Sequence, residues 1–208
     1  MYIVLLGAPG SGKGTVGEKI SKQLTLPTIS TGDILRENIK NQTKLGQVVA
    51  SIMEKGELVS DDIVVNLVKN RLEEADCKNG CIFDGFPRTV NQAKLLNKII
   101  NIDKAVLIDV EKDVITNRIL SRKTCPKCSK TYSMTIYKQD TCLLCGEKLV
   151  KRQDDTIETI EKRYETYEQQ TKPVIEFYKS INKLIAINGD DTPDGVYNKV
   201  LNAINTEN

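Results

Sequence analysis

A glycine-rich segment at residues 7–15 has the composition of a loop that binds phosphate. It reads Gly-Ala-Pro-Gly-Ser-Gly-Lys-Gly-Thr, follows an apolar run and precedes a stretch with helical periodicity, which is the context such a loop requires. Glycines allow consecutive backbone N–H groups to converge on phosphate oxygens, and the N-terminus of the following helix adds positive charge. Lys13 then offers a mobile cation to a transferring phosphoryl group. The predicted phosphate contacts are Gly10, Ser11, Gly12, Lys13, Gly14 and Thr15.

The loop departs from the usual motif at residue 14. A Ser or Thr whose hydroxyl ligates magnesium normally follows the lysine, but this chain has Gly14 there and Thr15 one step later. We therefore expect Mg²⁺ to be held mainly by nucleotide phosphates and water. This departure disfavours GTPase-type switches and motor ATPases and favours small nucleotide kinases.

Four cysteines form two Cys-x-x-Cys pairs, Cys125 with Cys128 and Cys142 with Cys145, separated by thirteen residues. This spacing is typical of a tetrahedral zinc site with four thiolate ligands. Such a site leaves no position open for water, so the predicted Zn²⁺ is structural. Two redox pairs or disulfides are the alternative, and they fit a small insertion in a cytosolic chain less well.

Composition narrows the possible functions. Histidine is absent, which excludes Ser-His-Asp chemistry, a histidine general base and histidine metal ligands. The net charge of +2 is too small for a nucleic-acid coat, and no apolar run approaches the length of about 20 residues that spans a bilayer. We expect a cytoplasmic monomer that binds neither nucleic acid nor membrane, with disorder confined to residues 205–208. The remaining cysteines, Cys77 and Cys81, are interpreted as ordinary buried thiols.

The elements that must position these groups alternate along the chain. Short apolar runs predict strands, and apolar residues at spacings of three and four predict helices. Strands that alternate with helices favour an α/β fold, with a parallel sheet covered on both faces. The expected strands are 2–6, 28–30, 81–84, 104–110 and 184–187, and the expected helices are 13–24, 61–75, 90–101, 112–121 and 157–180.

Two segments interrupt this alternation. Residues 31–59 read as short helices that could form a small substrate flap. Residues 121–155 carry the cysteine pairs and alternating β-type residues such as Tyr132, Met134 and Ile136, which predicts a separate β-rich insertion.

Five motifs in the same order as in the adenylate kinase family make the chain resemble that family in its long-lid, zinc-binding form. The motifs are residues 7–15, 30–36, 56–59 and 84–89, and Gln92. The resemblance implies a P-loop kinase fold, a three-layer sandwich with a five-stranded parallel sheet. It also implies a core of residues 1–30, 60–120 and 156–208, an AMP-binding flap at 31–59 and a zinc-binding lid at 121–155.

The resemblance further implies which residues hold each nucleotide. The residues implied to hold AMP are Thr31, Arg36, Glu57, Leu58, Val59, Gly85, Phe86, Pro87, Arg88 and Gln92. Besides the loop, the residues implied to face ATP are Arg118, Arg122, Thr131, Tyr132 and the backbone of Asp190. Arg152 and Arg163 match family arginines that bridge the two phosphate groups.

Phosphoryl transfer requires positioning and neutralisation of charge rather than covalent work by the protein. The predicted catalytic residues are Lys13, Asp84, Arg88, Arg122, Arg152 and Arg163. Arginine suits bidentate contact with phosphate, although any single arginine is more often a solvated surface charge, and the motif register favours the functional role most strongly for Arg88. Asp84, at the end of a predicted strand, is assigned to water-mediated contact with Mg²⁺.

Three further carboxylates carry weaker hypotheses. Asp33 either assists this contact or simply occupies a helix N-terminus. Asp154 and Asp155 either hold Arg122 or Arg152 in place or form a solvated turn.

The predicted activity is reversible phosphoryl transfer from Mg-ATP to AMP, giving two ADP. A UMP/CMP kinase is the nearest alternative, and Thr31 and Gln92 argue against it, because an amide can pair with an adenine edge. A zinc-ribbon protein that binds nucleic acid is a weaker alternative, given near-neutral charge and an aromatic content of 5%.

Overall fold

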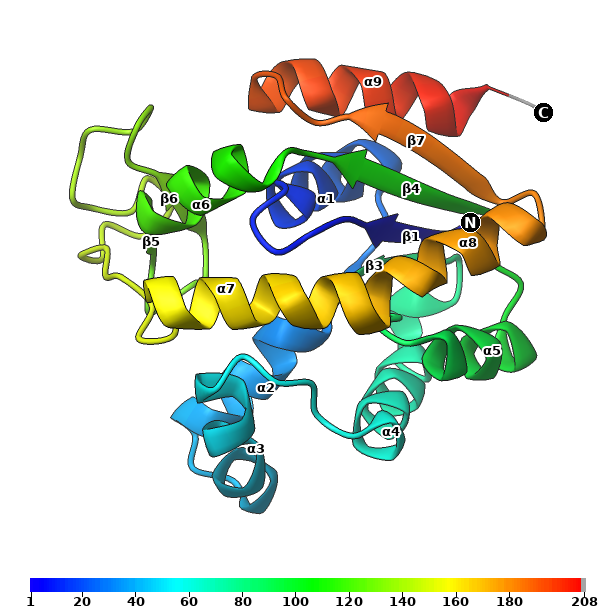
Figure 1. The fold of residues 1–208 in the computed structure, drawn as a ribbon, viewed down its shortest axis with the longest axis horizontal. Coiled ribbons are helices and arrows are strands. Elements are labelled where there is room, and N and C mark those ends of the chain that lie inside the picture. Colours follow the sequence, from blue (N-terminus) through cyan, green and yellow to red (C-terminus); the bar gives the residue numbers. More distant parts are fainter. Residues whose placement is uncertain (207–208) are drawn as a thin grey trace.

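A five-stranded, wholly parallel sheet forms the centre of the computed structural model, which describes residues 1–206 (Figure 1). The strand order is β2-β3-β1-β4-β7. The strands are β1 (Tyr2–Leu6), β2 (Thr28–Ser30), β3 (Cys81–Asp84), β4 (Lys104–Asp109) and β7 (Leu184–Asn188). The five predicted strands and the predicted parallel sheet are confirmed.

Alternation along β1 shows why helices cover both faces of the sheet. Val4 and Leu6 belong to one buried cluster, whereas Ile3 and Leu5 belong to a second cluster on the opposite face. Successive side chains of a strand point to opposite faces, so a strand that is apolar throughout must be covered twice. The result is the predicted three-layer α/β sandwich.

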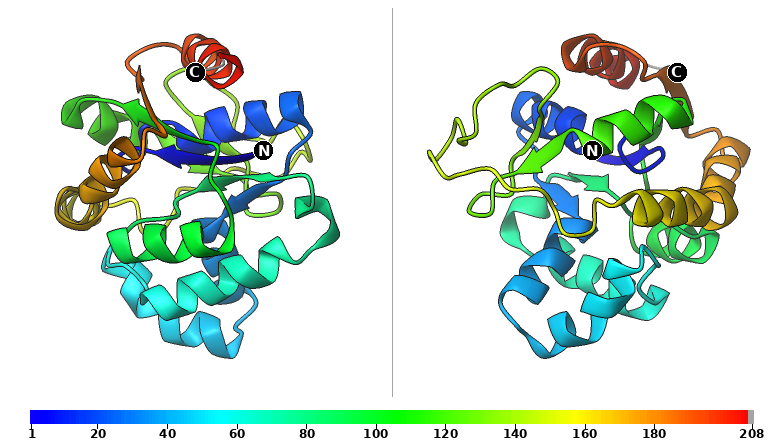
Figure 2. Two further views of the ribbon diagram at one scale, coloured as in Figure 1. Left: turned by 90° about the vertical axis from the view of Figure 1, so that its right-hand side faces the viewer. Right: turned by 60° about the vertical axis from the view of Figure 1, so that its left-hand side comes forward.

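The helices divide between these two clusters (Figure 2). Helices α4, α5 and α8 contribute to the cluster with Val4, and α1, α6, α7 and α9 contribute to the cluster with Ile3. Their bounds are α1 (Lys13–Leu24), α4 (Asp61–Leu72), α5 (Val90–Ile99), α6 (Lys112–Leu120), α7 (Ile157–Thr166), α8 (Lys172–Ser180) and α9 (Pro193–Asn205), with a 3₁₀ turn η1 (Ala75–Cys77). Helix α9 was not predicted.

The predicted helix 157–180 is interrupted by a π-helical segment, η2 (Tyr167–Thr171), between α7 and α8. Ile160 and Tyr167 pack in the cluster with Ile3, but Val174 and Tyr178 pack in the other cluster. A π turn shifts the helical register, and this shift lets one long helix present its apolar side to both clusters. Periodicity alone predicts the helix but not this interruption.

The flap segment consists of two short helices, α2 (Thr31–Lys40) and α3 (Lys44–Glu54), as predicted. Ser30 caps α2 by accepting a hydrogen bond from the Asp33 backbone N–H, and Thr43 caps α3 in the same way. Leu35 and Val49 anchor the two helices in the cluster with Val4.

The insertion at 121–155 has little regular structure. Strands β5 (Arg122–Thr124) and β6 (Thr131–Ser133) pair antiparallel, and its buried cluster consists of Cys125, Tyr132, Cys142 and Leu149. Of the alternating β-type residues, Tyr132 lies in β6, whereas Met134 and Ile136 lie beyond it. The backbone N–H groups of Ile136 and Tyr137 both donate to the Ser133 carbonyl, so the chain turns directly after β6.

Three smaller expectations concern single residues and the chain end. Cys77 and Cys81 are buried, as predicted. Of the tail expected to be disordered, Asn205 ends α9, and residues 207–208 lie outside the described part. Among residues 1–206, no helix has the length and apolar content needed to cross a bilayer.

Candidate active site

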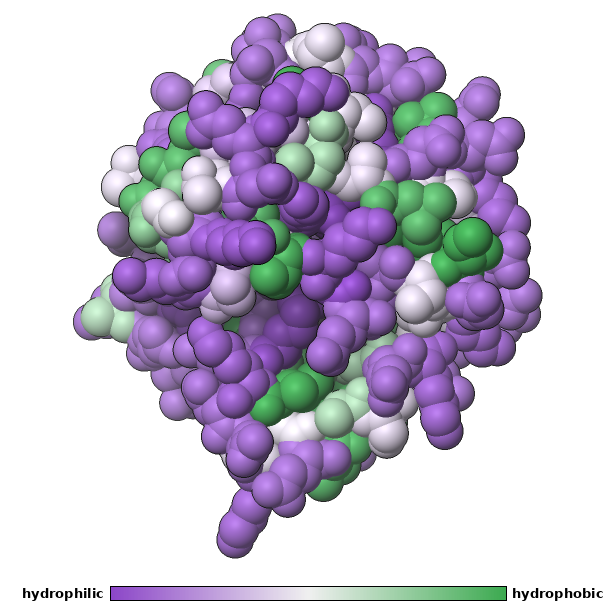
Figure 3. Space-filling model, turned by 90° about the vertical axis from the view of Figure 1, so that its left-hand side faces the viewer, coloured by the Kyte–Doolittle hydropathy of each residue, from purple (hydrophilic) through white to green (hydrophobic). Residues whose placement is uncertain are grey.

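The cavity that collects the predicted residues has a volume of about 1040 Å³ and lies at the carboxyl ends of β1, β2 and β3. The loop 7–15 follows β1, Thr31 follows β2, and Asp84 ends β3, so the parallel sheet brings all three to one edge. The lining also includes residues of the flap and of the insertion at 121–155. Figure 3 shows mainly hydrophilic residues around a hollow on this side of the molecule.

The loop 7–15 has the geometry that its glycines predict. Gly10 and Gly12 have φ values of 85° and 101°, which residues with a side chain rarely adopt, and Gly12 is the N-cap of α1. The Lys13 ammonium donates to the carbonyls of Gly7 and Ala8, each at 2.8 Å. The loop therefore curls around its own lysine, with the N-terminus of α1 at its base.

Gly14 is explained by its neighbour Asp84. A Cβ atom at position 14 would lie 3.3 Å from Asp84 Oδ2, so the glycine lets this carboxylate approach the start of α1 closely. Burial raises the pKa of Asp84, while the nearby cation Lys13 opposes that shift. Gly14, which departs from the usual loop motif, thus makes room for Asp84, the carboxylate that the sequence assigns to magnesium.

Lys13 is electrostatically tuned by the same surroundings. Burial lowers the pKa of its ammonium from 10.5 to about 8. The Asp84 carboxylate opposes this shift, whereas two nearby cations, Arg88 and Arg122, add to it. A polyanion bound in the loop would reverse the shift, because opposite charge favours the protonated form.

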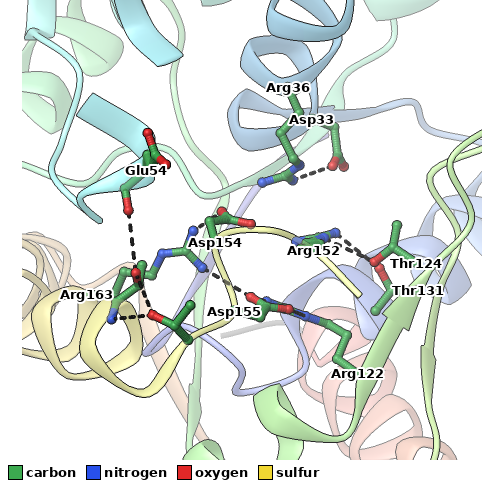
Figure 4. Close-up of polar contacts among 12 residues, drawn as sticks. Asp33, Arg36, Glu54, Arg122, Thr124, Thr131, Arg152, Asp154, Asp155 and Arg163 are labelled. Atoms are coloured by element: carbon green, nitrogen blue, oxygen red, sulfur yellow. Dashed lines mark hydrogen bonds and ion pairs between the residues drawn. The ribbon is translucent and has the colours of Figure 1, made fainter. Parts of the chain in front are cut away.

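The predicted arginines converge on this cavity from all three parts of the chain. Arg36 comes from the flap, Arg88 from the loop after β3, Arg122 and Arg152 from the insertion, and Arg163 from α7. Figure 4 shows Arg122 and Arg163 beside Asp154 and Asp155, with Arg36 beside Asp33 and Arg152 beside Thr124 and Thr131.

Two aspartates at the end of the insertion orient Arg122 and Arg163. Asp155 accepts from Arg122 Nε at 2.9 Å and also pairs with Arg163, and its side chain is only 2% exposed. Asp154 pairs with Arg163. The hypothesis that these aspartates hold Arg122 is confirmed for Asp155, while the pairing of Asp154 with Arg163 was not anticipated.

Arg88 and Arg152 are held by neutral groups instead. Arg88 Nε donates to the Gly85 carbonyl at 2.8 Å, and Arg152 donates to the hydroxyls of Thr124 and Thr131 at 3.1 and 3.3 Å. Burial lowers the pKa of each guanidinium to about 10, and neighbouring arginines add to the shift, while Asp84 opposes it at Arg88. Like charges pressed together in a buried site provide strong, preorganised attraction for phosphate groups.

Asp33 serves Arg36. Its carboxylate forms an ion pair with Arg36, and its backbone N–H caps α2 through Ser30. Burial raises the pKa of Asp33, but the charge and hydrogen bond of Arg36, together with the Ser30 hydroxyl and Arg152, lower it below its ordinary value. Both features agree with the helix N-terminal interpretation.

On the flap side, several predicted contacts form one connected group. Thr31 Oγ1 donates to the Gly85 carbonyl at 2.8 Å, and Gln92 Oε1 accepts from the Arg88 backbone N–H at 2.7 Å. Glu57, Leu58, Val59, Gly85, Pro87, Arg88 and Gln92 all line the cavity. Phe86 does not, because its side chain is buried in the core beside Phe83.

On the other side, the structure separates residues that the sequence grouped together. Arg118 lines the cavity and donates to the carbonyls of Ser11 and Gly189 at 3.4 and 3.0 Å. Tyr132 also lines it, but its hydroxyl lies 3.2 Å from Cys142 Sγ. Asp190 lies outside the lining, and its backbone N–H donates to Asn188 Oδ1.

The four cysteines of the two pairs meet within the insertion, with all sulfurs inside 4.8 Å of one another. The contacts are 3.4 Å for Cys125 with Cys145, 3.5 Å for Cys128 with Cys142 and 3.8 Å for Cys145 with Cys128. A tetrahedral site with zinc–sulfur bonds of about 2.3 Å requires sulfur separations of about 3.8 Å. The cluster therefore fits a zinc ion.

The cavity gathers positive charge from three parts of the chain, which suits an enzyme that moves a phosphoryl group between two bound substrates. With the parallel sheet and the loop after β1, this charge places the protein among the P-loop phosphotransferases. A family model described as adenylate kinase matches residues 5–183. The chain is also similar to adenylate kinases of Clostridium tetani (46% identity), Caldicellulosiruptor bescii (44%) and Clostridium perfringens strain SM101 (42%), each match covering 100% of both chains.

The chain therefore belongs to the adenylate kinase family. It is a nucleoside monophosphate kinase with adenylate kinase function, as the sequence predicted. Members of this family use Mg²⁺ with ATP and act on ATP, AMP and ADP.

Proposed function

We propose that this chain binds Mg-ATP on the loop 7–15 side of the cavity and AMP between the flap and α5, and transfers the terminal phosphoryl group between them. The observation that carries this assignment is the convergence of Lys13 and the five arginines on one cavity. Cations from core, flap and insertion meet where the phosphates of two nucleotides would be adjacent.

Each group has a defined task in this proposal. Lys13 and the loop N–H groups bind the donor phosphates, and Arg88 binds the acceptor phosphate. Arg122, Arg152 and Arg163 neutralise charge on the phosphoryl group as it moves, a task in which fixed cations act without reorganisation. Asp84 would hold water around the Mg²⁺ that accompanies ATP. Gly14, which has no side chain, leaves room for the Asp84 carboxylate beside the loop.

We further propose the division into a core at 1–30, 60–120 and 156–208, a flap at 31–59 and a lid at 121–155. The flap and lid contact each other directly, since Lys40 of α2 donates to the Pro126 carbonyl at 2.8 Å. The lid also contacts α1 through the ion pair of Lys130 with Glu18. Two covers that meet over the cavity would keep water from competing for the phosphoryl group.

The thiolates of Cys125, Cys128, Cys142 and Cys145 would hold a structural Zn²⁺ in the lid, because four sulfurs complete a tetrahedron and leave no site for substrate. That the protein is monomeric and cytoplasmic, and that it binds neither nucleic acid nor membrane, are predictions that depend on composition alone.

The test is a coupled assay of the purified protein with Mg-ATP and, in turn, AMP, CMP, UMP and GMP. The proposal expects AMP to be the preferred acceptor and two ADP to form for each ATP consumed. Preference for CMP or UMP would instead favour the pyrimidine kinase alternative.

A further inference from the structure

Asp61, the first residue of α4, receives hydrogen bonds from three side chains at the start of α5. Its carboxylate accepts from Thr89 Oγ1 at 3.1 Å, from Asn91 Nδ2 at 2.7 Å and from Gln92 Nε2 at 2.8 Å. Of these donors, Gln92 lines the active-site cavity. The neighbouring carboxylate, Asp62, is exposed.

The Gln92 amide can adopt only one orientation in this setting. The Arg88 backbone N–H can only donate, so it requires the oxygen Oε1, and the Asp61 carboxylate accepts from three side-chain donors, so it requires the nitrogen Nε2. Rotating the amide by half a turn would place N–H against N–H and oxygen against carboxylate. Because Gln92 is only 2% exposed, little water is available to relieve either mismatch.

The locked amide still has capacity for a ligand. A primary amide offers two N–H donors and two acceptor sites, and within residues 1–206 each atom of this amide has one protein partner. One donor and one acceptor therefore remain, in a fixed order along the amide edge.

We propose that Asp61 is a specificity-determining positioning residue that holds the Gln92 amide in the orientation that accepts adenine and rejects 6-oxopurines. The inference rests on the proposed contact between Gln92 and the AMP base. Adenine presents a donor at N6 beside an acceptor at N1, whereas hypoxanthine presents an acceptor at O6 beside a donor at N1. An amide that could rotate would pair with either edge, but an amide locked by Asp61 pairs only with the first.

The same contacts also stabilise the fold, and the test must separate this structural role from the positioning of the Gln92 amide. Thr89 caps α5 by accepting from the Gln92 backbone N–H at 3.1 Å, so the Asp61 network ties α4 to the cap of α5. A structural role alone predicts a loss of stability and an equal effect on every acceptor nucleotide. Only the positioning role predicts a change in the ratio between two acceptors.

The experiment compares AMP with inosine monophosphate as acceptors. The two nucleotides have nearly the same size, but the donor and the acceptor at N1 and position 6 of the purine are exchanged. In Asp61→Asn, the new side chain can face Gln92 with either its oxygen or its nitrogen, so one of the two contacts that fix the amide is lost and only the Arg88 backbone N–H still favours the original orientation. We expect the ratio of kcat/KM for AMP over inosine monophosphate to fall about tenfold. The matched controls Asp62→Asn, on the exposed neighbour, and Asn91→Ala, on the donor that does not line the cavity, should keep the parental ratio.

The ratio is measured on one protein sample, so it does not depend on how much of the variant is folded. Asp61→Ser serves as a second variant with the same expected direction. In a Gln92→Leu background, adding Asp61→Asn should not change the ratio further. An unchanged ratio in both Asp61 variants overturns the proposal, whereas an unchanged ratio in Gln92→Leu alone shows instead that the proposed base contact is wrong.

Discussion

The loop 7–15 and the insertion at 121–155, the proposed lid, are built on opposite principles. The loop follows a strand that is buried on both faces, and its cation, Lys13, is fixed by the hydrogen bonds that it donates to loop carbonyls. The lid has a buried cluster of only four residues, two of which are cysteines. An insertion of this size cannot bury enough apolar surface to order itself, so it depends on its thiolate cluster.

We therefore expect turnover to depend on the charged residues of the core and the order of the insertion to depend on its cysteines. Substitutions in the core site should remove turnover while the fold persists, since they act on charge rather than packing. Substitutions in the lid cluster should remove order and metal while part of the turnover persists.

Lys13→Ala and Arg88→Ala should each lower kcat by about 10²–10⁴-fold, because each removes a preorganised cation from the transferring phosphate. The melting temperature should change little. Steady-state assays and thermal unfolding measure the two effects, with Lys22→Ala, an exposed lysine on the same helix, as the control. Near-normal turnover of either variant, in a preparation free of contaminating kinase, would exclude the assigned roles.

Cys142→Ser should remove the lid zinc and lower the melting temperature by about 5 °C or more, at roughly 2–4 °C per kcal/mol for a chain of this size. Activity should remain measurable at low temperature, where the lid can still close. Metal analysis, thermal unfolding and a cold assay provide the readouts. Cys77→Ser, a buried thiol outside the cluster, should retain one zinc per chain.

Finding no zinc in the parental protein would contradict this account of the lid. So would a complete loss of cold activity in Cys142→Ser while its lid remains folded.

Gln92→Leu should raise KM for AMP about tenfold while KM for ATP stays nearly constant, because one hydrogen-bonding partner of the acceptor base is lost. The ratio of kcat/KM for AMP over CMP should fall as well. Initial-rate assays with both acceptors decide the matter. Equal effects on AMP and ATP would show that the substitution acts through the α5 cap rather than through the base.

The smallest effect concerns pH. Lys13 must carry its proton to attract phosphate, and burial lowers its pKa to about 8, so kcat/KM for ATP should fall several-fold as pH rises from about 7.5 to 9. The fall in kcat should come at higher pH, because bound phosphates raise the pKa of Lys13. In Lys13→Arg, which is slower overall, this alkaline limb should disappear. A kcat/KM profile that is flat to high pH would contradict the assignment.

Sequence reasoning succeeded where the signal was local. The loop 7–15, the sheet strands and the cysteine spacing each depend on residues close together in the chain. Helix α9 carried local signals that were overlooked, namely a Thr192 cap, Pro193 in the first turn and buried residues four apart, Val196, Val200 and Ile204.

What the sequence could not predict depends on contacts between distant residues. The Gln92 amide is fixed by Asp61, 31 residues away, and Arg122 by Asp155, 33 residues away. Nothing in the local pattern of Asp61 distinguishes it from Asp62, since both begin the same helix. The turn after β6 likewise depends on the Ser133 carbonyl rather than on β propensity.

The division between a catalytic core and a metal-ordered lid is tested most directly by following the terminal phosphoryl group of ATP. Purified protein is given Mg-ATP labelled at the γ-phosphate together with AMP, before and after zinc is removed with a chelator. The account predicts that label enters ADP almost entirely in the zinc-loaded protein. After zinc removal, transfer should slow and a larger share of label should appear as inorganic phosphate. An unchanged rate and an unchanged partition after zinc removal would contradict the account.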